Sequence, residues 1–327
     1  MTFLSNLSYY IPKEDYSNNK ILKNKNRIKI IKKIGINRKF KASANEFASD
    51  LSIKSIKKLK FFKSKRKKID FFINCTQSND YILPGNSTYI QNKLSLNKIP
   101  CIDLNMGCSG FVYSLCIAKS LIETNVAKCV LISTSDTYSK LIEIKNENVS
   151  SIFGDAAASC IVEKNDIKTS IGLFDLGSDG EGFRDLIVHN RSLKKDFNEE
   201  NSLCMNGPAM FSFAIREVPK TITNTLKKNN LKKKDIDYFI LHQANLYMLN
   251  SIREKLNIDK EKMLNFIDYG NTTSSTIPIV LYEGIKSKKI KSGNKVLICG
   301  FGLGASWSST IIKVSQKLIN NINKVID

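Results

Sequence analysis

Residues 69–76 read IDFFINCT and residues 236–243 read IDYFILHQ, and this recurrence decides the fold. A second apolar run follows each copy, VLIS from Val130 and VLIC from Val296, which lie 61 and 60 residues after the isoleucine that opens the copy. Apolar and aromatic runs without polar alternation are typical of strands buried on both faces of a sheet. Two pairs of such strands at the same spacing predict a duplicated α/β unit.

The duplication divides the chain into two halves, residues 1–167 and residues 168–327, which we expect to pack closely against each other. Residues 164–206 contain a glycine-rich and a polar stretch, and they are predicted to form an irregular insertion or lid between the halves. Ser43 followed by Glu46 is a capping pattern that starts the first predicted helix. The rest of the chain predicts a layered α-β-α arrangement. Helices are expected at 43–59, 87–96, 111–125, 208–228 and 278–286, with another that follows the second IDxF strand and ends at 256. Further strands are expected at 102–105, 156–162 and 308–314.

The composition indicates a globular protein with a strong excess of positive charge. Of the 327 residues, 42% are hydrophobic, and the net charge is +21. Neither a signal-peptide pattern nor an apolar run of about 20 residues is present, so we expect a cytoplasmic protein without membrane contact. The densest basic clusters, residues 54–68 and 227–234, each precede one IDxF strand, where lysines suit a helix C-terminus. The alternative is that they attract an acidic partner such as a carrier protein; the basic residues show no nucleic-acid motif.

The chain has eight cysteines and two histidines. Most cysteines lie in apolar runs, so we expect free thiols rather than disulfides. No C-x-x-C pair exists, and two histidines are too few for a common metal site, so no metal is expected.

Cys108 is the candidate nucleophile. It stands in the sequence GCSG, at the predicted start of a helix, where the unpaired N–H groups and the dipole stabilise a thiolate. His242 directly follows the second IDxF strand and is the candidate imidazole partner, although a satisfied core histidine is the alternative; His189 lies in the irregular region and is expected at the surface. Asn271 could be a turn residue, but its place in the second half matches that of Cys108 in the first.

Six motifs together resemble β-ketoacyl-acyl-carrier-protein synthase III, a family of condensing enzymes. The resemblance implies the thiolase-like fold, a duplicated layered α-β-α-β-α core. It runs in order along nearly the whole chain, through D-x-x-x-x-C-S-G-F (103–111), F-G-D-A-A-A (153–158), M-N-G-x-x-x-F (205–211), H-Q-A-N (242–245), Y-G-N-T (269–272) and F-G-x-G-x-S-W (301–307).

The resemblance implies a decarboxylative Claisen condensation without a cofactor. Cys108 would take an acyl group as a thioester, and the backbone N–H groups of Cys108 and Leu303 would bind the oxyanion. A malonyl-acyl-carrier protein would then lose carbon dioxide while His242 and Asn271 donate hydrogen bonds to its thioester oxygen. The resulting carbanion would attack the acyl-cysteine and give a 3-oxoacyl-carrier protein. Phe301 would pack beside the pair and exclude water.

The resemblance also implies a homodimer and an acyl carrier protein as partner. It assigns substrate contacts to Leu83, Gly207, Phe211 and Asn245, with Leu83 reaching the partner subunit's acyl pocket. Docking of the carrier is assigned to the basic residues near the expected tunnel mouth, which are Arg216, Arg253 and Lys255.

Several positions depart from the family pattern. Lys29 and Glu147 stand where a tryptophan and an arginine usually clamp the adenine of coenzyme A. Tyr247 replaces a basic residue associated with carrier docking, Leu303 replaces a glycine, and Leu83 replaces an aromatic residue. We therefore expect intact chemistry but altered donor recognition, with either a carrier-bound acyl donor or a coenzyme A ester held in another way.

Two other functions remain open at this point. One is transfer of the acyl group from Cys108 to a hydroxyl or amine in a specialised pathway, such as the synthesis of a glycan or a secondary metabolite. The other is an inactive scaffold partner of a condensing enzyme. Asn271 favours condensation because simple acyl transfer requires no enolate to be stabilised, and the complete Cys-His-Asn set argues against an inactive scaffold.

Overall fold

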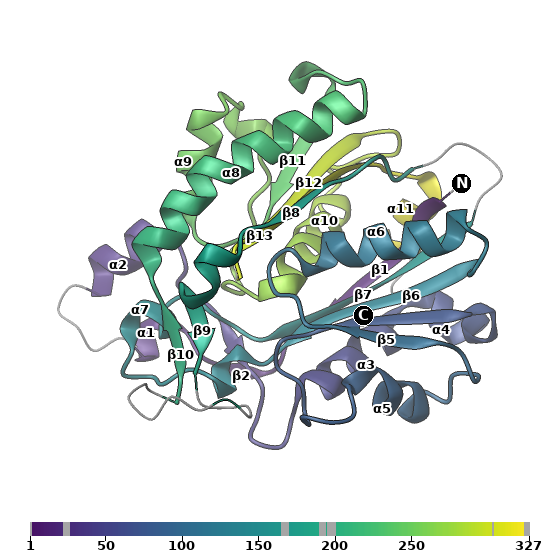
Figure 1. Cartoon of the computed structure of the whole chain (residues 1–327), viewed down its shortest axis with the longest axis horizontal. Helices are drawn as coiled ribbons and strands as arrows, with labels where there is room; N and C mark the ends of the chain where they lie inside the picture. Colours follow the sequence, from purple (N-terminus) through teal and green to yellow (C-terminus); the bar gives the residue numbers. More distant parts are fainter. Residues whose placement is uncertain are drawn as a thin grey trace.

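The computed structural model describes residues 2–21, 27–164, 170–189, 194, 201–302 and 304–323. Two mixed sheets lie in layers with helices, and two helices run between the sheets (Figure 1). The thiolase-like fold expected from the sequence is therefore the one observed. None of the helices in the described ranges has both the length and the apolar character needed to cross a membrane.

The first sheet contains the first copy of the repeated segment. Strand β4, which contains that copy, pairs in parallel with β5 and with the central strand β6, while β7 runs antiparallel to β6 and β1 antiparallel to β7. The strands follow in the order β1 (Thr2–Tyr10), β7 (Ala156–Lys164), β6 (Cys129–Asp136), β4 (Phe71–Cys75) and β5 (Cys101–Leu104).

The second sheet repeats this pattern with the second copy. Strand β11 pairs in parallel with β12, β13 runs antiparallel to β12, and β8 runs antiparallel to β13. In order, the strands are β11 (Tyr238–Leu241), β12 (Lys295–Gly302), β13 (Ser306–Lys313) and β8 (Asp175–Ser178). Phe71 pairs with Val130 and Tyr238 with Val296, so each repeated segment lies beside the VLI run of its own half.

The segment 164–206 is only partly the irregular insertion that was expected. Strand β8 belongs to the second sheet, and β9 (Leu186–Val188) pairs with β10 (Leu203–Met205) in a small sheet of their own. These strands have three or four residues each, too few for alternation to reveal them. Of the polar stretch from 190 to 202, most residues lie outside the described ranges.

Two central helices, α6 (Gly110–Glu123) and α10 (Thr276–Lys286), pack between the sheets. Their apolar side chains join both sheets in one core, which includes Leu115, Leu281, Ile132 and Ile298. The outer layers are α3 (Ala48–Lys58) and α5 (Asn86–Lys93) on the first sheet, α8 (Gly207–Lys228) and α9 (Leu246–Lys255) on the second, and α11 (Gln316–Asn323) against β1. The short elements are α1 (Asn18–Ile21), α2 (Arg27–Ile34), α4 (Lys60–Lys65), α7 (Glu147–Ser150), β2 (Glu14–Asp15) and β3 (Phe40–Lys41).

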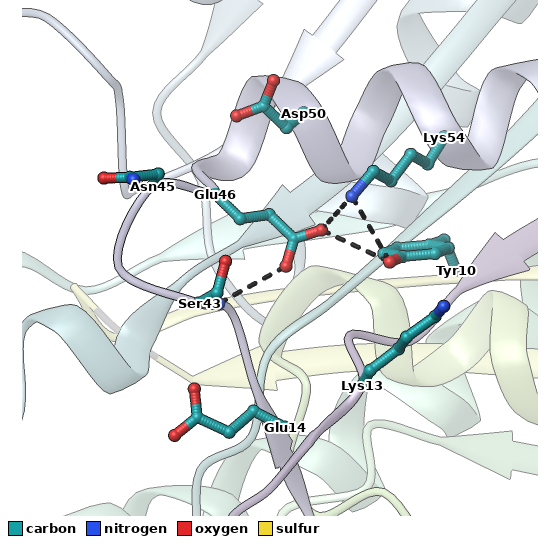
Figure 2. A pocket seen from close by; sticks show the side chains of 8 residues that line it. All are labelled: Tyr10, Lys13, Glu14, Ser43, Asn45, Glu46, Asp50 and Lys54. Atoms are coloured by element: carbon teal, nitrogen blue, oxygen red, sulfur yellow. Dashed lines mark hydrogen bonds and ion pairs between the residues drawn. The ribbon is translucent and has the colours of Figure 1, made fainter.

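The capping pattern at Ser43 does not start a helix. Helix α3 begins at Ala48, where the Phe47 N–H donates to the Asp50 carboxylate over 3.0 Å. Figure 2 shows that the Glu46 carboxylate, in a surface pocket of about 620 Å³, accepts from Ser43 N–H and is also engaged by the Lys54 ammonium and the Tyr10 hydroxyl. Glu46 therefore closes a turn before the helix and does not act within its first turn.

Candidate active site

A cavity of about 140 Å³, here called the inner chamber, brings the predicted catalytic residues together. Cys108, His242 and Asn271 all line it, as does Phe301. Cys108 follows β5 and His242 follows β11. Asn271 precedes α10, and Phe301 lies at the end of β12. The chamber therefore lies where the two repeated units meet. In the sequence, only the duplication indicated that these residues would come together.

Cys108 lies in the turn that precedes α6 and is 5% exposed. Gly110 N–H donates to the Gly107 carbonyl over 2.7 Å and closes this turn. Strand β12 approaches the turn so closely that a Cβ atom on Gly302 would lie 2.9 Å from Cys108 Sγ, and one on Gly300 would lie 2.6 Å from the Cys108 carbonyl oxygen. Both glycines are needed for this approach; Gly302 belongs to the F-G-x-G-x-S-W motif, whereas the sequence predicted no role for Gly300.

His242 is held at the end of β11 as a buried, neutral ring. The backbone N–H of His242 donates to the Cys299 carbonyl over 2.8 Å, and Nδ1 of the ring lies 2.8 Å from the Thr276 hydroxyl. The Phe301 ring stands perpendicular to it with 5.6 Å between the centroids. Burial lowers the pKa of His242 to about 3, so the imidazole carries no charge near neutral pH.

Asn271 is fixed on both its backbone and its side chain. Its N–H donates to the Ile152 carbonyl over 2.9 Å, and its carbonyl accepts from Gly154 N–H over 3.1 Å. The side-chain oxygen accepts from Thr273 N–H over 2.9 Å, so the group that Asn271 offers to the chamber is its NH₂ donor. The preceding Gly270 has φ +75°, and a Cβ there would lie 2.9 Å from the Ile152 carbonyl oxygen.

Asp136 is a functional residue that the sequence reasoning missed. This fully buried carboxylate at the end of β6 accepts from the Thr273 and Ser274 hydroxyls and from Gln77 N–H. Gln77 in turn accepts from the Tyr138 hydroxyl over 2.7 Å, and its Oε1 would lie 2.4 Å from a Cβ atom on Gly107. One carboxylate thus connects the loop after Asn271 to the turn that carries Cys108. Its only sequence signal was an acidic residue ending an apolar strand.

A second cavity of about 570 Å³, the outer chamber, adjoins the inner one. Both are lined by Gly207 and Asn245, and Phe211 lines the outer chamber only, so three of the four predicted substrate contacts lie along this path. Asn245 also has a structural role, because its side chain accepts from Met248 N–H over 2.9 Å and caps α9. Asn206 caps α8 in the same way, through Ala209 N–H.

The mouth of the outer chamber carries aromatic rings and a lysine. Tyr247 is 47% exposed and stacks on Phe211, with 5.4 Å between the ring centroids and 24° between the planes. Lys33 Nζ lies 4.7 Å from the centre of the Tyr247 ring. Glu147 is on the wall of this chamber, whereas Lys29 is exposed on α2.

Several predicted residues lie away from both chambers. Leu83 is 83% exposed in the loop before α5. Arg216 pairs with Glu217 over 2.6 Å, and Arg253 donates to the Ile258 carbonyl over 3.3 Å. Lys255 ends α9 on the surface. Leu303, the predicted oxyanion donor, lies outside the described residues.

Comparisons of the sequence with known proteins point to one family. Residues 102–180 match the family model described as 3-oxoacyl-[acyl-carrier-protein] synthase III, and residues 226–314 match the model of its C-terminal part. A β-ketoacyl-[acyl-carrier-protein] synthase III of Fusobacterium nucleatum is 34% identical, covering 95% of this chain and 98% of that protein. A β-ketoacyl-[acyl-carrier-protein] synthase III 2 of Halalkalibacterium halodurans is 32% identical, covering 93% and 94%.

Solved structures agree. A crystal structure of a 3-oxoacyl-(acyl-carrier-protein) synthase III matches with a TM-score of 0.91 and 31% identity, over 96% of this chain and 99% of that one. A 3-oxoacyl-(acyl-carrier protein) synthase of Burkholderia xenovorans matches with a TM-score of 0.91 and 29% identity, over 97% and 95%. A Xanthomonas campestris protein named OleA, 17% identical with a TM-score of 0.84, shares the fold.

Proposed function

The chain belongs to the β-ketoacyl-[acyl-carrier-protein] synthase III family, and we propose that its inner chamber is the active site for the family's condensation. The enzyme is an acyltransferase that joins an acyl thioester to malonyl-acyl-carrier protein and releases carbon dioxide. The observation that carries the assignment of the site is that Cys108, His242 and Asn271, separated by up to 163 residues, line one buried cavity.

In the first half-reaction Cys108 takes the acyl group. Its Sγ attacks the thioester carbonyl, the bond to the donor's sulfur breaks, and the proton of the thiol passes to the leaving thiolate. The start of α6 favours the thiolate form, because the first N–H groups of a helix have no partner within it. The close approach of Gly302 to Cys108 keeps the backbone of β12 beside the reacting carbonyl, where the family's oxyanion donor is expected.

In the second half-reaction the malonyl group loses carbon dioxide, and the enolate left behind attacks the acyl-cysteine. The negative charge that develops on the thioester oxygen needs a donor already in place. The Asn271 NH₂ group fits this role because its side-chain oxygen is engaged by Thr273. The neutral His242 and the perpendicular ring of Phe301, both buried, complete the wall of the chamber.

The alternative is transfer of the acyl group to a hydroxyl or amine. Such a transfer needs the nucleophile and a proton acceptor, but it forms no enolate. The orientation of Asn271 toward the chamber favours condensation, because a fixed amide donor would have no partner in the simpler reaction.

Mass spectrometry after incubation with an acyl donor and malonyl-carrier protein tests this proposal. We expect an acyl group on Cys108 and a 3-oxoacyl-carrier product. Cys108→Ser should abolish both, whereas Cys116→Ser, in the middle of α6 and half-buried, should leave both in place. A labelled acyl group on another cysteine, or acyl-Cys108 with no carbon–carbon bond formed, would overturn the assignment.

We also propose a homodimer with β5 at the contact. Strand β5 ends the order of the first sheet and is only half-buried. The loop between β4 and α5 presents three consecutive large apolar residues: Tyr81 is 60% exposed, Ile82 71% and Leu83 83%. A sheet edge beside an exposed apolar run is the kind of surface that a second copy covers. Leu83 would then reach the partner's acyl pocket, and the basic surface around Arg216, Arg253 and Lys255 would receive the acidic carrier in what we expect to be a cytoplasmic reaction.

The outer chamber bears on the identity of the acyl donor. The tryptophan–arginine clamp of the family is absent at Lys29 and Glu147, yet the chamber mouth presents Tyr247 stacked on Phe211. We propose that a coenzyme A donor, if used, places its base against this aromatic pair instead. A carrier-bound donor has no base and would make no use of the pair.

A further inference from the structure

Lys39 is a lysine with no exposed surface, and the reaction described above makes no use of it. Its Nζ donates to the Ser150 carbonyl over 2.6 Å and to the Tyr16 carbonyl over 3.0 Å, and it lies 3.9 Å from the centre of the Tyr16 ring. Burial of a lysine head group is costly unless hydrogen bonds replace its water. The two carbonyls provide these bonds, so the head group joins two segments that are far apart in the sequence.

The stem of the same side chain lies against the loop that carries Asn271. A Cβ atom on Gly270 would lie 3.3 Å from both Cβ and Cδ of Lys39, and one on Gly154 would lie 3.2 Å from Lys39 Cβ. Gly270 immediately precedes Asn271, and Gly154 N–H donates to the Asn271 carbonyl. The methylene groups of Lys39 therefore pack against the backbone on both sides of this hydrogen bond.

Residues 150–154 hold the backbone of Asn271. Phe153 and Asn271 form an isolated parallel bridge, whose two hydrogen bonds, 2.9 and 3.1 Å long, join Asn271 to the two neighbours of Phe153. Lys39 binds the first residue of this segment through Nζ and packs against the last one through its stem. Because the segment and Asn271 are hydrogen-bonded to each other, a shift of the segment would also displace Asn271.

We propose that Lys39 is a positioning residue for Asn271, because it fastens residues 150–154 and thereby holds the Asn271 amide donor at its place in the inner chamber. The inference rests on the proposed function, in which Asn271 serves the decarboxylation but not the acylation of Cys108. Burial lowers the pKa of Lys39 to about 7. The ammonium has three N–H groups and the neutral amine has two, so either form has enough donors for the two carbonyls.

Separate measurement of the two half-reactions tests the positioning role. Lys39→Met keeps an apolar stem but removes the N–H donors, so we expect kcat for release of labelled carbon dioxide from malonyl-carrier protein to fall about tenfold, with acylation of Cys108 nearly unchanged. Lys39→Arg keeps the donors and a cation for the Tyr16 ring, and it should restore most of this loss. Lys119→Met is the matched control, because Lys119 is only 9% exposed but lies in α6, paired with Glu123. An equal loss in both half-reactions, no loss at all, or a loss that arginine does not reduce would overturn the proposal.

Hydrogen–deuterium exchange gives a readout that needs no substrate. In Lys39→Met we expect faster exchange in the peptides that contain residues 150–154 and 268–273, and no such change in the control variant. If Lys39→Met does not fold, Lys39→Gln, which has two N–H groups on a shorter stem, takes its place with the same expectations. Unchanged exchange in both peptides would contradict the positioning role. If the wild type acylates Cys108 but never condenses, the proposed function fails while the exchange rates still decide whether Lys39 holds the Asn271 loop, so the two failures are distinguishable.

Discussion

At the scale of single residues, hydrogen bonds within the protein occupy one polar atom of each catalytic side chain and leave the other for the substrate. Asn271 uses its oxygen on Thr273 N–H and keeps its NH₂ group for the chamber. His242 uses Nδ1 on Thr276 and keeps Nε2. Each residue can therefore perform its chemistry without rearranging when the substrate arrives, which is the condition for strong electrostatic stabilisation of a transition state.

Substitution of Asn271 should impair decarboxylation far more than acylation. In Asn271→Asp the NH₂ donor becomes a carboxyl oxygen, so we expect condensation to fall by a factor of roughly 10² or more, as when an oxyanion donor is removed. His242→Ala should cause a similar loss, with the acyl-Cys108 still detectable by mass spectrometry. The matched controls are Asn257→Asp, at an exposed loop position, and His189→Ala. Condensation at the wild-type rate in His242→Ala would show that the assignment is wrong.

At the scale of elements, the site depends on loops that belong to different halves. Asp136 at the end of β6 binds the loop after β4 through Gln77 and the loop before α10 through Thr273 and Ser274. Burial of this carboxylate outweighs its hydrogen bonds and raises its pKa to about 6 from the ordinary 3.8. The contacts that align these two loops thus contain a group that resists ionisation.

The stability difference between the wild type and Asp136→Asn should depend on pH. Between about pH 4 and pH 6 the folded wild type keeps a proton that its unfolded chain has released, so its unfolding free energy falls as the pH rises. The variant lacks this proton. Relative to it, we expect the unfolding free energy of the wild type to fall by about 3 kcal/mol across this range and not to change further above it. Urea unfolding of both proteins from pH 4 to pH 8 measures this. A difference that stays constant with pH would contradict the raised pKa.

At the scale of the whole molecule, two surfaces are unlike the rest. The edge strand β5 lies in the sheet next to the strand whose loop carries the exposed Tyr81, Ile82 and Leu83. On the other side of the seam, the outer chamber opens beside α2, α8 and α9 with Lys33, Phe211 and Tyr247 at its mouth. The first surface fits a second copy of the chain, and the second fits the distal part of a thioester donor.

Sedimentation should find a dimer at micromolar concentration. Leu83→Glu places a charge in the proposed contact, so we expect a shift toward monomer and weaker acylation by apolar donors, because the partner's pocket loses its apolar lining. Val126→Glu is the control, since Val126 is 63% exposed at the end of α6 and away from this loop. A wild-type monomer at this concentration would count against the shared pocket.

Donor choice follows from comparing acylation by acyl-coenzyme A, acyl-pantetheine and the matching acyl-carrier protein. If a base stacks on Tyr247, Tyr247→Leu should weaken only the coenzyme A donor, by roughly 5- to 150-fold, as for the loss of a stack worth about 1–3 kcal/mol. Phe183→Leu, at another exposed aromatic residue, is the control. A carrier donor would instead be favoured at low salt, because the net charge of +21 attracts an acidic protein. A preference for the carrier would be ruled out by two results together. Acyl-coenzyme A would acylate Cys108 as fast as the carrier donor at both low and high salt concentration, and substitution of Lys29 would leave that rate unchanged.

The sequence by itself determined the two repeated pairs of buried strands and the three residues that line the inner chamber, because these depend on local patterns. Buried strands show as apolar runs, and a nucleophile at a helix start shows as a cysteine among small residues. Strands β1 and β8, the true start of α3 at Ala48 and the contacts of Asp136, Thr276 and Gly302 were decided only by the tertiary structure. The two strands and the three contacts depend on partners distant along the chain, such as Cys108, which lies 194 residues before Gly302, and on burial that no local pattern reports. Chain folding brings such partners together, so their hydrogen bonds and close contacts exist only in three dimensions.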